Sequence, residues 1–196
     1  MSLNKQKKDL QNRLMLSFLL ALLALPLIYW LFHPIHQTIG MTPKIQGFLL
    51  NQAAPIEKFS LINHNNQTFT EKNFKGKWHL ISYGYTQCPD ICPTTLVVMT
   101  ELAQLLRKNN LANDLQFIFY TIDPTRDSIE VLSRYIHYFD DDFIALRPSE
   151  NDSFLAFEQS LGIKASIALN KNKTTDYDVS HNLSLLVVNP QAKLQA

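Results

Sequence analysis

A run of 19 uncharged residues near the N-terminus divides this chain of 196 residues into two parts. The run extends from Leu14 to Phe32 and, as a helix, would span roughly 28 Å, which is close to the hydrocarbon thickness of a bilayer. Four basic residues and one acidic residue precede it, and the next basic residue after it is Lys44. The positive-inside rule then places the N-terminus in the cytoplasm and the rest of the chain outside. We therefore expect a membrane anchor followed by a domain on its far side.

Two other interpretations of the run fit the residues less well. A cleaved signal peptide would have a shorter apolar region and a cleavage site of small residues, whereas this run ends in Ile-Tyr-Trp-Leu-Phe-His-Pro. A buried core helix would show a polar stripe, and only Ser17 interrupts this run. We predict a cytoplasmic basic segment over 1–13, a transmembrane anchor over 14–32, a linker over 33–52 and a domain over 53–196.

The composition excludes several classes of protein. An apolar fraction of 46% excludes a disordered chain. Residues beyond 36 include 14 basic and 16 acidic side chains, so the domain has no basic field to attract nucleic acid. The chain has only two cysteines, Cys88 and Cys92, which excludes a disulfide-stapled scaffold, a four-cysteine zinc site and a four-cysteine iron–sulfur site. In an oxidising compartment, these two cysteines can pair or be kept reduced for a purpose.

Strand and helix patterns alternate through the domain. A hairpin is predicted around His64, with strands over 59–62 and 67–70. Further predicted strands cover 78–85, 115–122, 143–146 and 183–188, and predicted helices cover 94–108, 128–139 and 151–161. This alternation predicts an α/β domain with a mostly parallel sheet covered by helices.

The two cysteines stand four residues apart between a predicted strand and a predicted helix. This junction is the carboxyl end of a strand, where open α/β sheets bind ligands. Residues four apart on a helical turn share one face, so both sulfurs of Cys88 and Cys92 can point at one atom. Two thiolates suit a soft ion such as Cu(I) or Zn(II), and they equally suit reversible disulfide chemistry. A purely structural disulfide is a third possibility, although so short a loop would add little stability.

His181 is the candidate for a third ligand because of its position. It comes immediately before the last predicted strand, and in such a sheet the loop leading into that strand lies beside the loop after the first central strand. His181 can therefore face the cysteines although it follows Cys92 by 89 residues.

Four strings of this chain resemble the Sco/SenC family of copper chaperones: GYTQCPDICPTTL, TIDPTRDSIEVLSRY, FIAL and DYDVSHNLSLLVVNP. The resemblance covers roughly residues 52–196 and implies a thioredoxin-like fold with an N-terminal hairpin, preceded by one transmembrane helix. By position, it implies that Cys88 and Cys92 are copper-binding thiols and that His181 is the imidazole ligand. Asp123 resembles an acidic residue near that site and is a candidate for supporting the ligands.

The resemblance also implies a function and a location. Members of the family are membrane-anchored and help to assemble the dinuclear copper centre of cytochrome c oxidase. This implies copper, as Cu(I) or Cu(II), as the bound ion, the oxidase subunit with that centre as the recipient, and other copper chaperones as further partners. The implied location is the bacterial inner membrane with the domain in the periplasm, or the mitochondrial inner membrane facing the intermembrane space in a eukaryote.

The chain departs from the family pattern at two places. Ser180 stands where the family usually has an aspartate before the histidine, so another group must hold the tautomer of His181. The family continues past the final turn with another strand and a long helix. We therefore expect this strand and helix to be missing, an apolar patch to be exposed and the stability to be reduced.

A metallochaperone and a thiol–disulfide oxidoreductase are both compatible with the motif. The oxidoreductase would keep partner cysteines reduced and would need both cysteines but not His181. Ordinary thioredoxins have a cis-proline in the loop before the last strand, and residues 179–182 contain no proline, which favours metal handling. Peroxide reduction is a third possibility that needs an arginine beside the thiol, for which Arg126 is available.

Overall fold

The computed structural model describes residues 12–17, 20, 22, 25, 49–149, 153–169, 177–182 and 184–196. The chain forms two compact units, Met1–Gln46 and Gly47–Ala196. The predicted anchor over 14–32 lies largely outside the described residues. The described residues 12–17, which include its beginning, are helical. Among the residues described, no helix combines the length and the apolar character needed to cross a membrane.

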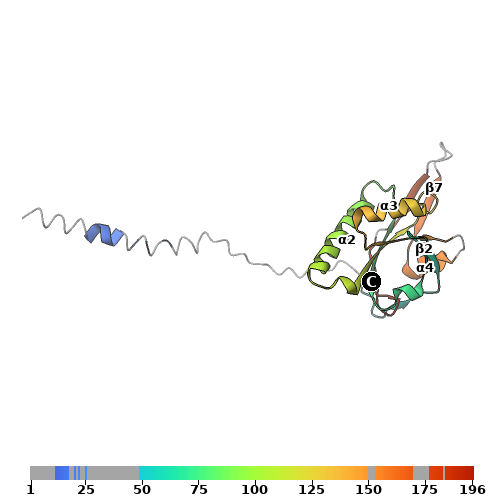
Figure 1. Ribbon diagram of the computed structural model, residues 1–196, viewed down its shortest axis with the longest axis horizontal. Coiled ribbons are helices and arrows are strands. Elements are labelled where there is room, and N and C mark those ends of the chain that lie inside the picture. The colour runs from blue at the N-terminus through green and yellow to red at the C-terminus, as the bar shows by residue number, and fades with distance from the viewer. Residues whose placement is uncertain are drawn as a thin grey trace, which may run out of the picture. The chain divides into compact units, whose positions relative to one another are not determined.

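A sheet of eight strands forms the centre of the second unit, in the order β1-β10-β9-β4-β5-β6-β2-β3 (Figure 1). Its strands are β1 (Ala54–Pro55), β2 (Ser60–Asn63), β3 (Thr68–Thr70), β4 (Trp78–Gly84), β5 (Leu115–Thr121), β6 (Ile144–Pro148), β9 (Leu186–Val188) and β10 (Lys193–Leu194). A separate antiparallel hairpin pairs β7 (Ala165–Leu169) with β8 (Tyr177–His181).

Helices lie on both faces of this sheet. They are α2 (Ile91–Lys108), α3 (Ile129–Phe139) and α4 (Phe154–Leu161), with short 3-10 helices η1 (Glu71–Phe74) and η2 (Ala112–Asp114). Figure 1 shows α2 and α3 on one side of the sheet and α4 on the other. The predicted boundary residues act as expected: the Ser128 side chain accepts a hydrogen bond from the Val131 amide at 3.3 Å, and Gly162 ends α4 in the left-handed region at φ 66°.

The sheet is parallel only at its centre. Strands β4, β5 and β6 run parallel because α2 and α3 return the chain to the same edge each time. The other five pairings are antiparallel, because hairpins extend the sheet on both sides. The prediction of a mostly parallel sheet is therefore wrong outside β4, β5 and β6.

Side chains of β5 alternate between two buried clusters. Phe117 and Phe119 face the cluster under α2 and α3, whereas Ile118 and Tyr120 face the cluster under α4. The α4 cluster is rich in rings, with Phe59, Phe69, Phe74 and Phe157 packed together. This two-sided core fixes β4 and β5 at the centre of the domain, and their carboxyl ends position the loops that contain the candidate site.

The C-terminal part of the sheet differs from the prediction. A strand follows the final turn, since β10 pairs with both β9 and β1, so the expectation that this strand is missing is wrong. An apolar stripe is exposed on α2, where Ile91, Val98 and Leu105 recur every seven residues and are each at least 44% exposed. This stripe lies on a helix, whereas the expected patch was on a face of the sheet, so the expectation of a patch left by a missing helix stays a prediction.

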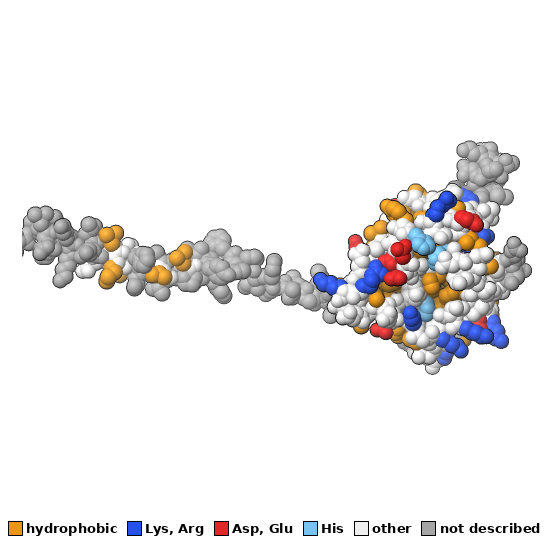
Figure 2. Space-filling view, viewed as in Figure 1, with side chains coloured by type: hydrophobic (Ala, Val, Ile, Leu, Met, Phe, Trp, Pro, Cys, Tyr) orange, Lys and Arg blue, Asp and Glu red, His pale blue; other side chains and the backbone are white. Residues whose placement is uncertain are grey.

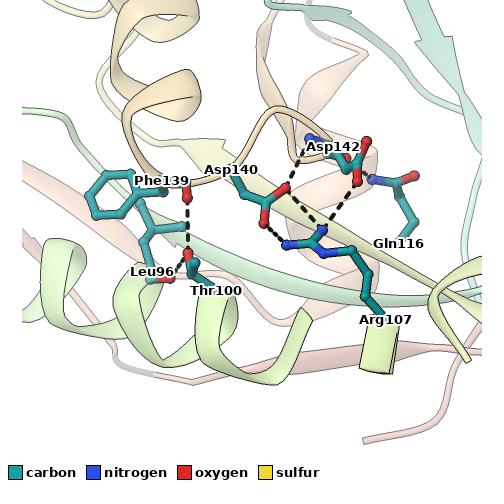
Figure 3. Close-up of polar contacts among 7 residues, drawn as sticks. All are labelled: Leu96, Thr100, Arg107, Gln116, Phe139, Asp140 and Asp142. Carbon is teal, nitrogen blue, oxygen red and sulfur yellow. Dashed lines mark hydrogen bonds and ion pairs between the residues drawn. The ribbon is translucent and has the colours of Figure 1, made fainter. Parts of the chain in front are cut away.

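The ends of α2 and α3 are joined by a polar cluster (Figure 3). Arg107 near the end of α2 forms ion pairs with Asp140 and Asp142, and the Gln116 side chain donates to the Asp142 carbonyl at 2.6 Å. The ion pair with Asp140 links the end of α2 to the residue that follows α3. Elsewhere on the face in Figure 2, acidic and basic side chains are interspersed among hydrophobic ones.

Candidate metal centre

The two thiols lie at the carboxyl end of β4. Cys88 is in the loop that follows the strand, and Cys92 is in the first turn of α2. Both cysteines are free; Cys88 is partly exposed and Cys92 is only 4% exposed. The Cys88 amide donates to the Tyr85 carbonyl at 3.2 Å, which forms a tight turn just before the helix. The fold thus holds one accessible and one buried sulfur next to each other.

Cys92 packs directly onto the end of the strand. A Cβ atom at Gly84 would lie 2.3 Å from the Cys92 sulfur and 3.7 Å from the Phe119 ring. Because non-bonded atoms cannot approach so closely, residue 84 must lack a side chain for the sulfur to occupy this place. Gly84 is therefore part of the site, although the sequence motif alone did not single it out.

The two thiols have opposite pKa shifts. Burial, and secondly the hydrogen bond that its S–H donates to Cys88, together raise the pKa of Cys92 to about 12. Burial also disfavours the Cys88 thiolate, but that hydrogen bond and the amides of Asp90, Ile91 and Cys92 outweigh it, so the pKa of Cys88 is lowered. The start of α2 thus stabilises one thiolate selectively, at the residue that solvent can reach.

A fully buried carboxylate fixes the beginning of the cysteine loop. Asp127 accepts hydrogen bonds from the Thr86 amide at 3.0 Å and from the Thr86 hydroxyl at 2.6 Å. It also accepts a bond from the hydroxyl of Thr121, the last residue of β5. One side chain therefore ties the loop after β4 to the end of β5, which restricts the positions that both sulfurs can take.

Tyr135 of α3 lies within electrostatic reach of the thiols and packs against Phe119, with 5.5 Å between the ring centroids. Burial raises its pKa, and so do the negative charges that Cys92, Cys88 and Asp127 hold when ionised. The Tyr135 hydroxyl is buried and has no hydrogen-bond partner among the residues described. It is consequently a buried hydroxyl within electrostatic reach of the thiols that sequence reasoning did not identify.

His181 lies next to the strand that leads into the cysteine loop. Its ring centroid is 5.7 Å from that of Tyr83 and 6.4 Å from that of Tyr85, the two residues that flank Gly84. His181 was predicted in a loop, but it ends β8, because the β7–β8 hairpin extends through residue 181. The long-range placement of His181 near the β4 end is therefore as expected, although its local structure is not.

The tautomer of His181 is set by its own backbone neighbour. Its Nδ1 lies 2.8 Å from the carbonyl oxygen of Asn182. Because a carbonyl can only accept, Nδ1 bears the hydrogen and Nε2 of the neutral ring is left with a lone pair. The Asn182 carbonyl thus fixes the tautomer of His181, and no aspartate at position 180 is needed for this.

The proposed ligands are near one another without forming a closed set. Among the described residues, no three His, Cys, Asp or Glu side chains are grouped closely enough to hold a metal ion. Cys88 and Cys92 are in contact, and the His181 ring packs near the tyrosine rings on either side of Gly84. The three-ligand site therefore remains a prediction that requires the His181 ring to move toward the sulfurs.

Asp123 and Arg126 connect the β5–α3 loop to this region. Asp123 is fully buried and forms an ion pair with Arg126. The Arg126 guanidinium lies over the Tyr85 ring, 5.5 Å from its centroid, and the same ring contacts His181. Three successive contacts, through Arg126 and Tyr85, thus link Asp123 to His181, and the supporting role of Asp123 stays a prediction.

Comparisons with known proteins agree with this arrangement. A central strand followed by a free dithiol at the start of a helix, within a mixed sheet covered on both faces, defines a thioredoxin-like α/β protein. The family model described as SCO1/SenC matches residues 50–196, and the chain belongs to this family. A Stutzerimonas stutzeri protein described as "Putative copper-binding protein" is 34% identical over 147 residues, which cover 75% of this chain and 70% of that protein.

Mitochondrial relatives and solved structures extend the comparison. The SCO2 homolog of Danio rerio is 33% identical over 67% of this chain, which spans only 47% of that relative. The structure of Bradyrhizobium japonicum ScoI with copper bound has a TM-score of 0.65 and 28% identity, covering 73% of this chain and 88% of that one. Yeast Sco1 with copper bound also has a TM-score of 0.65, with 29% identity, covering 73% of this chain and 78% of that one.

Proposed function

We propose that this protein is a membrane-anchored copper metallochaperone that binds copper through Cys88, Cys92 and His181. The observation that best supports this is the pair of free thiols in contact at the carboxyl end of β4, with the Nε2 lone pair of His181 nearby. The copper-bound ScoI and Sco1 structures support the choice of ion. The recipient is the cytochrome c oxidase subunit with the dinuclear copper centre, as the family resemblance implies.

The donor set suits copper in its reduced state. Two thiolates and one imidazole are soft or borderline ligands, and they would give Cu(I) a roughly trigonal site. Binding releases the protons of both thiols, so the energetic cost falls mainly on Cys92, whose pKa is about 12. Because the three side chains are not grouped closely enough to hold an ion, binding through His181 requires its ring to move toward the sulfurs, which makes the third ligand the adjustable one. Cu(II) would need a further ligand.

Copper titration of the full chain tests the ligand set. We expect wild-type protein to bind one equivalent of copper, and the Cys88→Ser and Cys92→Ser variants to lose this binding. His181→Ala should weaken Cu(II) binding by more than the roughly tenfold that loss of an outer contact costs, and it should change the absorption spectrum. His137→Ala, at an exposed position on α3, is the matched control. Unchanged affinity and spectrum in His181→Ala would contradict the three-ligand site.

The unequal thiols also favour a second function, thiol–disulfide exchange. The Cys88 thiolate would attack a partner disulfide to form a mixed disulfide, and Cys92 would displace the partner's second thiol. The protein dithiol is then oxidised, the partner disulfide is reduced by two electrons, and an external dithiol must restore the starting state. Equal rates of reduction of a model disulfide by His181→Ala and by wild-type protein, together with failure of the wild-type protein to bind copper, would favour this function over copper delivery.

A further inference from the structure

A cavity of about 220 Å³ opens beside the buried Cys92 thiol. It lies where β9 separates from β4. The last paired residues of these strands are Ile81 and Leu186, and Ser82 is the first residue of β4 beyond this pairing. The lining residues are Ser82, Tyr83, Ile91, Cys92, Thr95, Phe119, Ser184 and Leu185. Cys92 is nearly inaccessible from the outer surface, so this cavity is a second approach to its sulfur.

The Ser82 hydroxyl indicates that the cavity can bind a ligand group. Its side chain is 95% buried, and its hydroxyl has no hydrogen-bond partner among the residues described. A buried hydroxyl without a partner costs free energy, which a guest that accepts its hydrogen would recover. Thr95, on the opposite wall, differs because its hydroxyl already donates to the Ile91 carbonyl at 2.8 Å.

The lining also defines the chemistry of the guest. None of the eight lining side chains is charged, so a carboxylate or an ammonium group would lose its hydration without gaining an opposite charge. The Phe119 ring and the apolar side chains of Ile91 and Leu185 favour a polarizable neutral group, and sulfur packs well against aromatic rings. A neutral thiol or thioether can also accept a hydrogen bond from Ser82.

We propose that this cavity admits a neutral cysteine or methionine side chain from an extended segment of the recipient protein, and that copper leaves through Cys92. The proposal rests on the proposed copper-carrying function. A lone pair of the incoming sulfur forms a bond to Cu(I) while the bond to the Cys92 sulfur breaks, and the copper keeps its oxidation state. Cys92 then takes up one proton, supplied by the incoming thiol or, for a thioether, by water.

A metal-free modification experiment tests whether the cavity gives access to Cys92. In Cys88→Ser protein, the Cys92 thiolate attacks methyl methanethiosulfonate, forms the methyl disulfide and releases methanesulfinate. Ser82→Leu and Thr95→Leu fill the cavity from two walls, and each should slow this reaction about tenfold, because thiol exchange requires access to the sulfur. Ser82→Ala removes the hydroxyl without filling the cavity and should leave the rate near that of the parent. Thr94→Leu adds the same bulk at an exposed position on α2 and serves as the control.

Charged reagents supply a comparison that needs no cavity-filling variant. Two charged reagents, the sulfonatoethyl and trimethylammonioethyl methanethiosulfonates, are compared with the methyl reagent at each cysteine. The ratio of the charged-reagent rate to the methyl-reagent rate should be far smaller at Cys92 in Cys88→Ser protein than at Cys88 in Cys92→Ser protein. Equal charge selectivity at the two cysteines would overturn the proposal. Reaction of Cys92 at the parent rate in both folded filled variants would overturn it as well.

Copper release separates this proposal from the proposed function. The full chain loaded with Cu(I) should lose it to the peptide acetyl-Ala-Cys-Ala-amide faster than to equimolar N-acetylcysteine amide, and Ser82→Leu should slow release to the peptide about tenfold with unchanged equilibrium affinity. Wild-type protein that binds no copper would refute the proposed function and, with it, the copper step, whereas the modification rates would still decide whether the cavity gives access to Cys92. Copper release that Ser82→Leu does not slow would refute the cavity route alone, and equal rates for the peptide and the amide would refute a polypeptide guest.

Discussion

The sulfur of Cys92 occupies the space that a side chain at Gly84 would need, since a Cβ there would lie 2.3 Å from it. We expect Gly84→Ala to displace the first turn of α2 and to lower the free energy of unfolding by about 1–3 kcal/mol, the usual cost of overpacking. Urea unfolding of the metal-free protein measures this loss.

A double-mutant cycle isolates the contact. In a Cys92→Ala background the sulfur is gone, and the Phe119 ring atom 3.7 Å away is at an ordinary contact distance. Gly84→Ala should therefore cost much less in that background, and the difference is the coupling between the two residues. Equal costs in the two backgrounds would mean that the substitution acts through the strand and not through the thiol.

The two thiols should be alkylated in a fixed order. Because the pKa of Cys88 is lowered and that of Cys92 is raised to about 12, iodoacetamide at neutral pH should modify Cys88 first. Cys92→Ser keeps a hydroxyl donor beside Cys88, whereas Cys92→Ala removes it, so the alkylation midpoint of Cys88 should move to higher pH only in Cys92→Ala. Mass spectrometry across a pH series gives both midpoints; coincident midpoints would exclude a donated hydrogen bond as the cause.

Asp127 should control the order of the cysteine loop. Asp127→Ala leaves the Thr86 amide and two threonine hydroxyls without their acceptor, and we expect a loss of about 3 kcal/mol in stability. Asp127→Asn keeps one acceptor oxygen and should lose less. Hydrogen exchange of the Thr86 amide is the direct measurement, because exchange should accelerate in Asp127→Ala well beyond the change that global unfolding predicts.

His79 should make the domain less stable in mild acid. Burial lowers its pKa from 6.5 to about 4, so between these values the unfolded chain binds a proton that the folded domain does not. Stability from this residue is thus full above pH 6.5 and is lost as the pH falls toward 4, by about 3 kcal/mol in total at 1.36 kcal/mol per pH unit. His79→Phe keeps a ring against Phe74 and should flatten this dependence. An unchanged slope of unfolding free energy against pH in His79→Phe would assign the effect to other groups.

Local patterns along the chain predicted much of the fold. The helices around Leu96 and Leu132 have strong apolar periods, and Ser128 and Gly162 are chemically suited to helix ends. Strands β1, β7, β8 and β10 were missed, since strands of two to five residues leave little periodic signal. Their pairing depends on contacts between segments, which no local window contains.

The candidate ligands could be named from the sequence and stay a prediction, whereas the residues that support them could not be named. The spacing of Cys88 and Cys92 and the family strings pointed to the thiols, and the topology brought His181 near them. Gly84, Asp127 and Tyr135 act through contacts across the sheet and between helices, so no spacing rule reveals them. The hydrogen bond from His181 to Asn182 is local, but it depends on the backbone path at the end of β8.

The described chain of the second unit begins and ends on the same edge of the sheet. The Leu50 amide donates to the Gln195 carbonyl at 2.9 Å, and β1 pairs with β10 in antiparallel register just beyond. A pulling force applied between these two ends would break the hydrogen bonds between β1 and β10 one after another. The dithiol loop belongs to β4, two strands further in, so such mechanical load would be released at the edge before it reached the cysteines.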